Sequence, residues 1–379
     1  MDNNSEAISD TDRVEQTTKA ADEVGEALIR FEKEGAAARV RLNRPKSLNA
    51  LNDEMRAQFP DHLKAWAPDP EIYAMIISSD SERAFCVGGD VRELHAAGQA
   101  GTALKSLQAE YQLNWLLDRF TKPTISLISG MVMGSGVGIS QFGTHRVAGE
   151  NYSFAMPEVA IGFFPDVGAS WFLSRLDDYV GTYLGLTGSR IGRADAYALG
   201  LVTHCAPADQ FSKIIDGIAN ADPVDPMLDA LHEDPGAGEL DELRATIRRC
   251  FSAATMEEII LRLKAVKGPH EKWRDQTLAT IAKASPISLK VTLRQLRTGR
   301  RLDLRAALKL EYRLAAEFMA GDDFYEGVRA MLIDKDHAPN WQYKELIEIS
   351  DDIVDGYFRD AQEHDLVLKA PSDTDIANS

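Results

Sequence analysis

Cysteine is scarce in this chain, and its few cysteines are poorly placed for cross-linking. Cys86, Cys205 and Cys250 are the three cysteines among 379 residues. An odd number at wide spacing fits neither a disulfide framework nor a zinc site. None of the eight histidines is spaced from an acid as metal ligands are, so no metal is expected. These features indicate a reducing compartment, and we predict a cytoplasmic location.

Long apolar runs and an excess of positive charge are also absent. No run of about 18 apolar residues is present to span a bilayer, and the N-terminus lacks the basic and then apolar pattern of a signal peptide. Lysine and arginine number 42 against 59 acidic residues, a net charge of −17. We therefore expect no nucleic-acid or membrane partner, because both need clustered cations. A phosphate-bearing ligand would need a local basic patch.

Composition divides the chain into four parts. Residues 1–25 are acidic with almost no large apolar side chains, and are predicted to be disordered. Short apolar runs and glycine-rich turns at 26–210 indicate a core of strands and helices that carries the site. Residues 211–358 have helical patterns rich in Leu, Ala, Arg and Glu, apart from a loop expected at 222–238. The acidic tail 359–379 is predicted to be frayed.

The stretch 128–170 combines glycines with carboxylates. Three glycines alternate over 134–138 directly after an apolar run, and Glu158 and Asp166 each follow a proline. Glycines where a strand feeds a helix leave backbone N–H groups unpaired and accessible to a ligand. The prolines keep both acids out of helix interiors. This combination indicates a binding or catalytic site on rigid loops.

Other glycine motifs do not fit this stretch. The G-x-G-x-G spacing of 134–138 is not the dinucleotide pattern G-x-G-x-x-G, and no Gly-Lys-Ser/Thr follows as in a P-loop. Ser135 lacks the flanking glycines of a nucleophile elbow, so we do not expect it to act as a nucleophile. A second glycine pair, at 88–89, lies about 45 residues earlier. Two such turns that converge would supply two N–H donors to an oxyanion.

Six motifs carry a family resemblance: NRPKSLNAL (43–51), AFCVGGD (84–90), MGSGVG (133–138), FAMPE (154–158), IGFFPDVG (161–168) and EGVRAMLIDKD (326–336). They resemble the enoyl-CoA hydratase/isomerase (crotonase) superfamily, and within it the 3-hydroxyisobutyryl-CoA hydrolases. The resemblance covers roughly residues 26–345. It implies an α/β fold, a crotonase-like spiral of ββα units with a helical C-terminal region, that binds an acyl-CoA thioester.

The resemblance also implies roles for single residues. The N–H groups of Gly89 and Ser135 would form an oxyanion hole, Glu158 and Asp166 would be the catalytic carboxylates, and Glu110 would contact the substrate. The implied reaction is hydrolysis of a short 3-hydroxyacyl-CoA, namely 3-hydroxyisobutyryl-CoA to 3-hydroxyisobutyrate and CoA in valine catabolism. CoA would be part of the substrate, with no separate cofactor. A homo-oligomer is compatible with the sequence.

Several alternatives stay open from the sequence. Asp166 is also placed to cap a helix, and Glu110 fits a solvated helix position. Lys46 is a candidate for binding the CoA phosphates, as are Arg44 and Lys122, although a loop lysine is more often simply solvated.

Two other functions also stay open, an enoyl-CoA hydratase or isomerase and a non-catalytic acyl-CoA-binding protein. Hydratases that resemble this chain carry a glutamate where it has Gly138, and a glycine where it has Asp166. Hydration needs two carboxylates to hold and deliver one water, and that pair is missing here.

Overall fold

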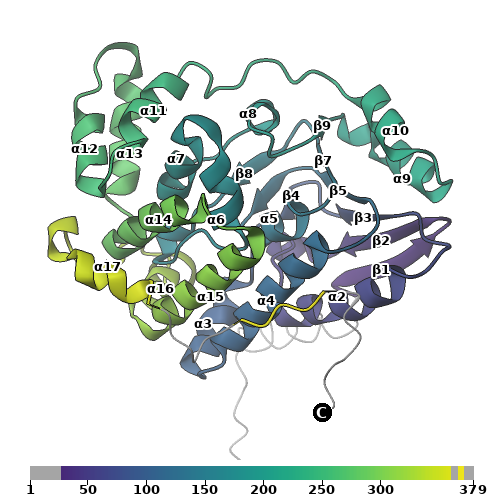
Figure 1. Ribbon diagram of the computed structural model, residues 1–379, viewed down its shortest axis with the longest axis horizontal. Coiled ribbons are helices and arrows are strands. Elements are labelled where there is room, and N and C mark those ends of the chain that lie inside the picture. The colour runs from purple at the N-terminus through teal and green to yellow at the C-terminus, as the bar shows by residue number, and fades with distance from the viewer. Residues whose placement is uncertain (1–26, 360–365, 371–379) are drawn as a thin grey trace, which may run out of the picture.

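The computed structural model describes residues 27–359 and 366–370, and it is built around two β-sheets (Figure 1). The segment 1–25, predicted to be disordered, lies outside the described residues. The larger sheet has the strand order β1 (Ile29–Glu34), β2 (Ala37–Leu42), β3 (Ala74–Ser79), β5 (Thr124–Ile128), β7 (His145–Ala148) and β9 (His204–Cys205). The smaller sheet has the order β4 (Ala84–Cys86), β6 (Met131–Met133) and β8 (Ser153–Ala155).

The chain alternates between the two sheets as it advances. Each of β3, β5 and β7 lies in the larger sheet and is followed by β4, β6 or β8 in the smaller one. Successive strands of these repeats pair in parallel within each sheet, whereas β1 and β2 form an antiparallel hairpin. Every repeat therefore moves the chain one strand along both sheets. This is the predicted spiral of ββα units, and the α/β fold class is confirmed.

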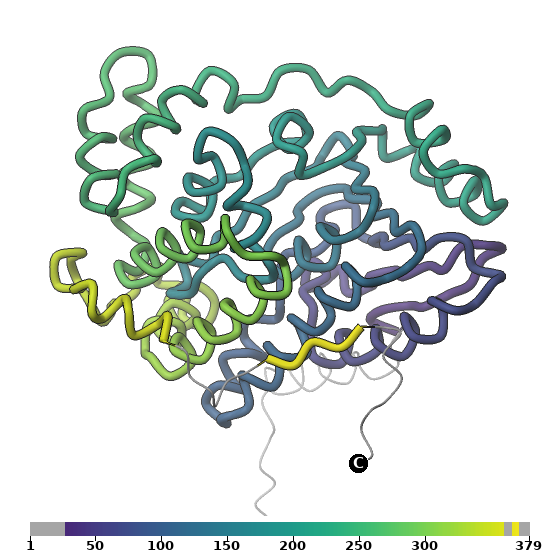
Figure 2. The backbone as a smooth tube through the Cα atoms, viewed as in Figure 1, coloured from purple at the N-terminus to yellow at the C-terminus, as the bar shows by residue number. Residues whose placement is uncertain are grey.

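Helices surround the sheets and make up most of the second half of the chain (Figures 1 and 2). Those of the first half are α2 (Asp53–Trp66), α3 (Val91–Gln99), α4 (Ala103–Asp118), α5 (Ser135–Ser140), α6 (Ala169–Phe172), α7 (Val180–Thr187) and α8 (Arg193–Ala198). Those of the second half are α9 (Phe211–Ala219), α10 (Val224–Leu231), α11 (Arg244–Phe251), α12 (Met256–Lys264), α13 (Glu271–Ile281), α14 (Pro286–Gly299), α15 (Leu304–Ala320), α16 (Asp323–Val328) and α17 (Asp351–Tyr357).

Both faces of the larger sheet are buried. In β3, Met75 and Ile77 belong to the main apolar core, and Ile76 points into a second cluster on the opposite face. That second face is covered by α9 and α10, which contribute Ile214 and Leu228. Parallel strands covered on both faces explain why β3 and β5 are almost continuously apolar in sequence.

The prediction of a loop at 222–238 is wrong over part of that range, because α10 lies within it. Pro226 is in the first turn of α10, where its missing N–H would have no helical partner. Val224 and Leu228 are one turn apart and both are buried against the sheet. Burial of this apolar face therefore forms a helix in a segment rich in Pro and Asp.

The C-terminal segment also differs from the expectation of a frayed tail at 359–379. Residues 366–370 lie along α4, as the yellow segment in Figures 1 and 2 shows. Leu366 and Leu368 are buried, and the side chain of Gln112 exchanges hydrogen bonds of 2.7 and 2.9 Å with the backbone of Lys369. Two alternating leucines are enough to hold this short stretch on the molecule.

Candidate active site

The first glycine turn connects β4 to α3. Gly88 has a φ of 116°, a conformation that side chains rarely allow. Gly89 pairs with Leu51 in a parallel bridge. The N–H of Leu51 donates to the backbone O of Gly88, and the N–H of Asp90 donates to the backbone O of Leu51. Because backbone N–H groups alternate in direction along an extended chain, the N–H of Gly89 faces away from Leu51.

The second glycine turn connects β6 to α5. Gly134 has a φ of 46° and directly precedes Ser135, the first residue of α5. The N–H of Ser135 is therefore one of the four that have no acceptor inside the helix.

The two turns touch each other. A Cβ atom added to Gly134 would lie 3.4 Å from the Cα of Gly88, and one added to Gly89 would lie 3.0 Å from the Oγ of Ser135. Larger residues at these positions would push the turns apart. The two glycine turns, about 45 residues apart in sequence, are thus neighbours in the fold.

A cavity of about 440 Å³ opens beside these turns. It collects side chains from α4, the turn Glu158–Ile161, α16 and the π-helical turn Arg329–Ile333. Its lining includes five of the six predicted site residues: Gly89, Glu110, Ser135, Glu158 and Asp166. Five positions spread over 78 residues of sequence are therefore neighbours around one space.

Glu158 begins a short 3₁₀ turn directly after Pro157. Its side chain is buried, and its Oε2 atom has no hydrogen-bond partner among the described residues. Burial raises the pKa of Glu158 to about 8, and the nearby charge of Glu110 adds to this increase. An unpaired carboxylate in such a place is available to react with a ligand.

Asp166 lies in the loop before α6, with Tyr111 of α4 beside it. The Tyr111 hydroxyl donates a hydrogen bond of 2.9 Å to Oδ2 of Asp166. Burial raises the pKa of Asp166 well above its ordinary range, and the charges of Glu110, Glu158 and Glu311 add to this, whereas the Tyr111 bond opposes it. Asp166 thus holds its proton more readily than a solvated aspartic acid does.

Glu110 is buried next to a buried cation, so it is not the solvated helix residue of the alternative interpretation. Nη1 of Arg56 lies 3.5 Å from Oε2 of Glu110 and donates a 3.0 Å hydrogen bond to the backbone O of Leu51. The second oxygen, Oε1 of Glu110, has no hydrogen-bond partner among the described residues. Arg56 therefore partly balances the negative charge of the cavity.

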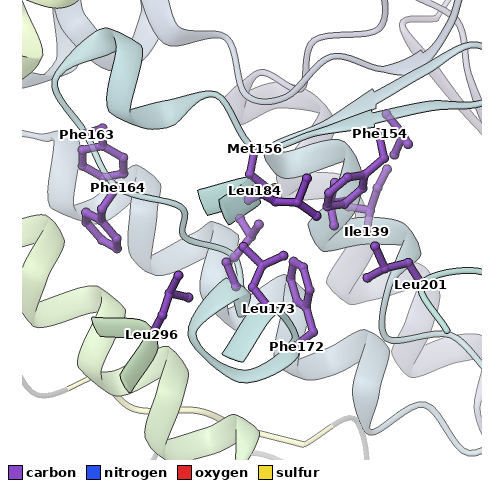
Figure 3. Close-up of a cluster of buried hydrophobic side chains, with 14 of the residues drawn as sticks. Ile139, Phe154, Met156, Phe163, Phe164, Phe172, Leu173, Leu184, Leu201 and Leu296 are labelled. Carbon is purple, nitrogen blue, oxygen red and sulfur yellow. The ribbon is translucent and has the colours of Figure 1, made fainter. Parts of the chain in front are cut away.

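An apolar wall accounts for much of the burial of the acids. Phe163 lines the cavity next to Phe164, with ring centroids 4.5 Å apart. Figure 3 shows these two rings side by side, with Leu296 of α14 close to them. Phe324 of α16 adds a further ring, 5.5 Å from Phe163. Water is thereby kept away from the carboxylates.

The predicted phosphate-binding cations are not among the residues that line the cavity. Lys46 is exposed on the 3₁₀ turn Pro45–Ser47. Arg44 forms a 2.8 Å ion pair with Asp90, and Lys122 donates hydrogen bonds to the backbone O atoms of Asp69 and Ile72. Arg44 and Lys122 thus hold the fold together through these contacts.

Ser135 and Cys86 are not arranged to act as nucleophiles at this cavity. No group of three His, Cys, Asp or Glu side chains in the described part of the chain is arranged to hold a metal ion. Burial raises the pKa of the Cys86 thiol to about 12, and the described residues around the cavity include no histidine to activate Ser135.

Within residues 27–359 and 366–370, no helix has the length and apolar character needed to cross a bilayer.

Four residues near the site escaped the sequence analysis: Arg56, Tyr111, Arg190 and Glu311. Arg190 is exposed and lines the cavity, so it is a cation at its edge. Tyr111 is 55 residues from Asp166 in sequence, and Glu311 lies 143 residues from Gly168, whose N–H it accepts. No local pattern links side chains over such separations.

Two sheets wound as a spiral, with two glycine turns that meet at a cavity of buried acids, define a protein of the crotonase type. A family model described as enoyl-CoA hydratase/isomerase matches residues 37–358. The chain belongs to the enoyl-CoA hydratase/isomerase family.

Comparison with individual proteins gives two kinds of neighbour. The 3-hydroxyisobutyryl-CoA hydrolase, mitochondrial, of Gallus gallus is 42% identical over 93% of this chain and 94% of its own length. The Danio rerio protein of the same name is 40% identical over 90% and 91%. A solved structure described as a carnitinyl-CoA dehydratase from Mycobacterium thermoresistibile has a TM-score of 0.85 and 33% identity, over 91% of this chain and 99% of that one.

The prediction of a cytoplasmic location is contradicted by these relatives, which are named as mitochondrial. The reasoning failed because three separated cysteines indicate only a reducing environment. Such an environment is not unique to the cytoplasm.

Proposed function

We propose that the protein hydrolyses 3-hydroxyisobutyryl-CoA to 3-hydroxyisobutyrate and free CoA, a step of valine catabolism. The observation that carries this proposal is the cavity in which the N–H groups of Gly89 and Ser135 lie beside the buried acids Glu158 and Asp166. Relatives named for this hydrolysis that match at least 90% of the chain support the choice of substrate.

The first step is attack on the thioester carbonyl. Its oxygen accepts hydrogen bonds from the N–H groups of Gly89 and Ser135, which together form an oxyanion hole. As the new C–O bond forms, negative charge moves onto this oxygen, and each donor stabilises it by about 3–4 kcal/mol. Ionised Glu158 either attacks the carbonyl carbon itself or takes a proton from an attacking water.

The second step breaks the C–S bond. The tetrahedral intermediate collapses, and the departing thiolate takes the proton that Asp166 holds because its pKa is raised. If Glu158 was the nucleophile, water then cleaves the anhydride. Either route consumes one water and returns a proton from that water to Asp166, so both acids regain their starting forms. The products are one carboxylic acid and one thiol.

The cavity also suits a hydroxylated acyl group. Oε1 of Glu110 has no hydrogen-bond partner among the described residues, so it can accept a bond from the substrate hydroxyl. Arg56 contacts Oε2 of Glu110 and does not occupy Oε1.

The test is release of free thiol from 3-hydroxyisobutyryl-CoA and from isobutyryl-CoA. We expect kcat/KM to be at least about tenfold higher for the hydroxylated substrate. Isobutyryl-CoA has no hydroxyl, so it would leave the buried acceptor Oε1 of Glu110 unpaired, which is unfavourable. Equal rates on the two thioesters would contradict this choice of acyl group. Absence of thiol release from any short acyl-CoA that binds tightly would instead favour the non-catalytic acyl-CoA-binding protein.

A hydratase or dehydratase is the second candidate, because a solved structural neighbour is described as a carnitinyl-CoA dehydratase. The position where similar hydratases carry a glutamate is Gly138 here. A Cβ atom at Gly138 would lie 2.7 Å from Nδ2 of Asn114 and 2.9 Å from Cβ of Val167, so this site has no room for an acid. Hydration of crotonyl-CoA at a rate near that of thiol release would favour the second candidate.

A further inference from the structure

The loop that presents Asp166 has a backbone conformation that must be held in place. Val167 has a φ of 51° and Gly168 one of 86°, two successive left-handed residues directly after Asp166. For a β-branched residue this conformation is strained. Val167 is fully buried, and the N–H of Ala169 closes a turn onto the backbone O of Asp166.

Glu311, in the middle of α15, contacts this loop directly. Its Oε2 accepts the N–H of Gly168 at 2.7 Å, and its Oε1 accepts the N–H of Ser170 at 2.8 Å. The Glu311 side chain is fully buried, and burial raises its pKa to about 7 although these bonds oppose the increase. Both carboxylate oxygens are thus occupied by backbone donors of the strained turn.

A second side chain holds the same loop from α14. Nε2 of Gln295 donates to the backbone O of Pro165 at 2.6 Å and to Oγ of Ser170 at 2.8 Å. The loop is therefore anchored on both sides of Asp166, from α14 and α15. Tyr111 holds the carboxyl end of the Asp166 side chain in addition.

We propose that Glu311 is a positioning residue for hydrolysis, which holds the strained 166–170 turn so that the Asp166 carboxyl group faces the cavity. This inference rests on the proposed function through the role of Asp166. Glu311 is not among the residues that line the cavity. It acts through the backbone N–H groups of Gly168 and Ser170. Each of these groups has one carboxylate oxygen of Glu311 as its acceptor.

A double-mutant cycle with Glu311→Gln and Asp166→Asn tests the proposal. The amide nitrogen of glutamine would face a backbone N–H, so one bond is lost and the turn shifts. We expect kcat for thiol release to fall about 10- to 100-fold, as for other small misplacements of a reacting group, with KM changed by less than about threefold. In the Asp166→Asn background the same change should cost less than about threefold, because its effect passes through Asp166.

Asp195→Asn is the matched control. Asp195 is a buried helical carboxylate that also accepts a backbone N–H, from Leu240 at 2.9 Å, but it does not line the cavity. We expect this variant to lose thermal stability and to keep kcat within about twofold. Equal losses of kcat in Asp195→Asn and Glu311→Gln would show a general stability effect and would overturn the proposal.

Gln295→Leu provides a second variant if Glu311→Gln does not fold. The Oε1 atom of Gln295 has no hydrogen-bond partner among the described residues, so leucine removes only the two bonds that Nε2 donates. We expect Gln295→Leu to lower kcat about 10- to 100-fold in the wild-type background, as for Glu311→Gln. In the Asp166→Asn background this loss should be absent. Additive losses in both cycles would refute a role through Asp166.

Amide hydrogen exchange separates failure of this inference from failure of the proposed function. The N–H groups of Gly168 and Ser170 should exchange at least about tenfold faster in Glu311→Gln than in the wild type, whatever the substrate. Faster exchange with no thiol release by the wild type would refute the hydrolase function alone. Unchanged exchange would refute the anchoring role of Glu311.

Discussion

At the residue scale, the candidate site depends on carboxylates that have been removed from water. Burial raises the pKa of Glu158 to about 8 and that of Asp166 well above its ordinary range. The two groups line one cavity, and the charge of Glu158 raises the pKa of Asp166 further. When Glu158 is ionised and Asp166 is protonated, the two groups supply a base and an acid together.

Glu158→Gln should lower kcat by several orders of magnitude with little change in KM, because the amide keeps the shape but is neither a nucleophile nor a base. Since ionised Glu158 is required, wild-type kcat/KM should rise about tenfold per pH unit below a pH of about 8 and then level off. The measurement is thiol release between pH 6 and 9, with the glutamine variant as the control for hydroxide-catalysed hydrolysis. A variant that kept a tenth of the activity would exclude Glu158 as the central group.

At the element scale, the position of α5 against β4 decides where the N–H of Ser135 points. A Cβ atom on Gly136 would lie 2.2 Å from the backbone O of Cys86. No side-chain rotation can remove this clash, because the contacted atom belongs to the backbone. The glycine therefore lets a helix approach a strand more closely than any other residue would. The same close approach brings the second glycine turn onto the first.

Gly136→Ala should displace α5 and separate the two N–H donors. We expect a loss of at least about 100-fold in kcat/KM together with a lower Tm, because backbone atoms on both sides must move. Gly192→Ala is the control, since a Cβ atom there meets nothing within 4 Å and its φ of −87° suits alanine. Circular dichroism melting and thiol release on both variants make the comparison. Wild-type activity in Gly136→Ala would disprove the close-approach argument.

At the scale of the whole molecule, a buried acid links the function of the site to the stability of the fold. Glu158 has a pKa of about 8 in the native state and an ordinary value of about 4.3 when unfolded. Between these values the native state binds more protons than the unfolded state. The contribution of Glu158 to the free energy of unfolding is therefore lost as pH rises from about 4 to 8.

Replacement of Glu158 by glutamine should remove this dependence on pH. We expect the Tm of Glu158→Gln to exceed that of the wild type, with a difference that grows by roughly 2–5 °C from pH 5 to pH 8. Thermal unfolding of both proteins in matched buffers measures it. A difference that shrinks as pH rises would mean that Glu158 is ionised in the native protein at neutral pH.

Much of the architecture was predictable because it rests on local patterns. The antiparallel hairpin, the Asn52 cap of α2, and the buried strands β3 and β5 follow from turn residues, cap chemistry and apolar runs within a few positions of one another. The short helix α10 was missed because its apolar face is visible only against the sheet. Residues 366–370 were missed for the same reason.

The sequence by itself determined the family, the spiral fold and five of the residues around the cavity, since those depend on motifs of fewer than a dozen residues. Only the tertiary structure decided which charges meet. It placed Arg56 on Glu110, Tyr111 on Asp166 and Glu311 on the turn after Asp166, and it left Lys46 outside the cavity lining. These contacts join side chains from 54 to 143 residues apart, and burial, which sets the pKa values, exists only after the whole chain has folded.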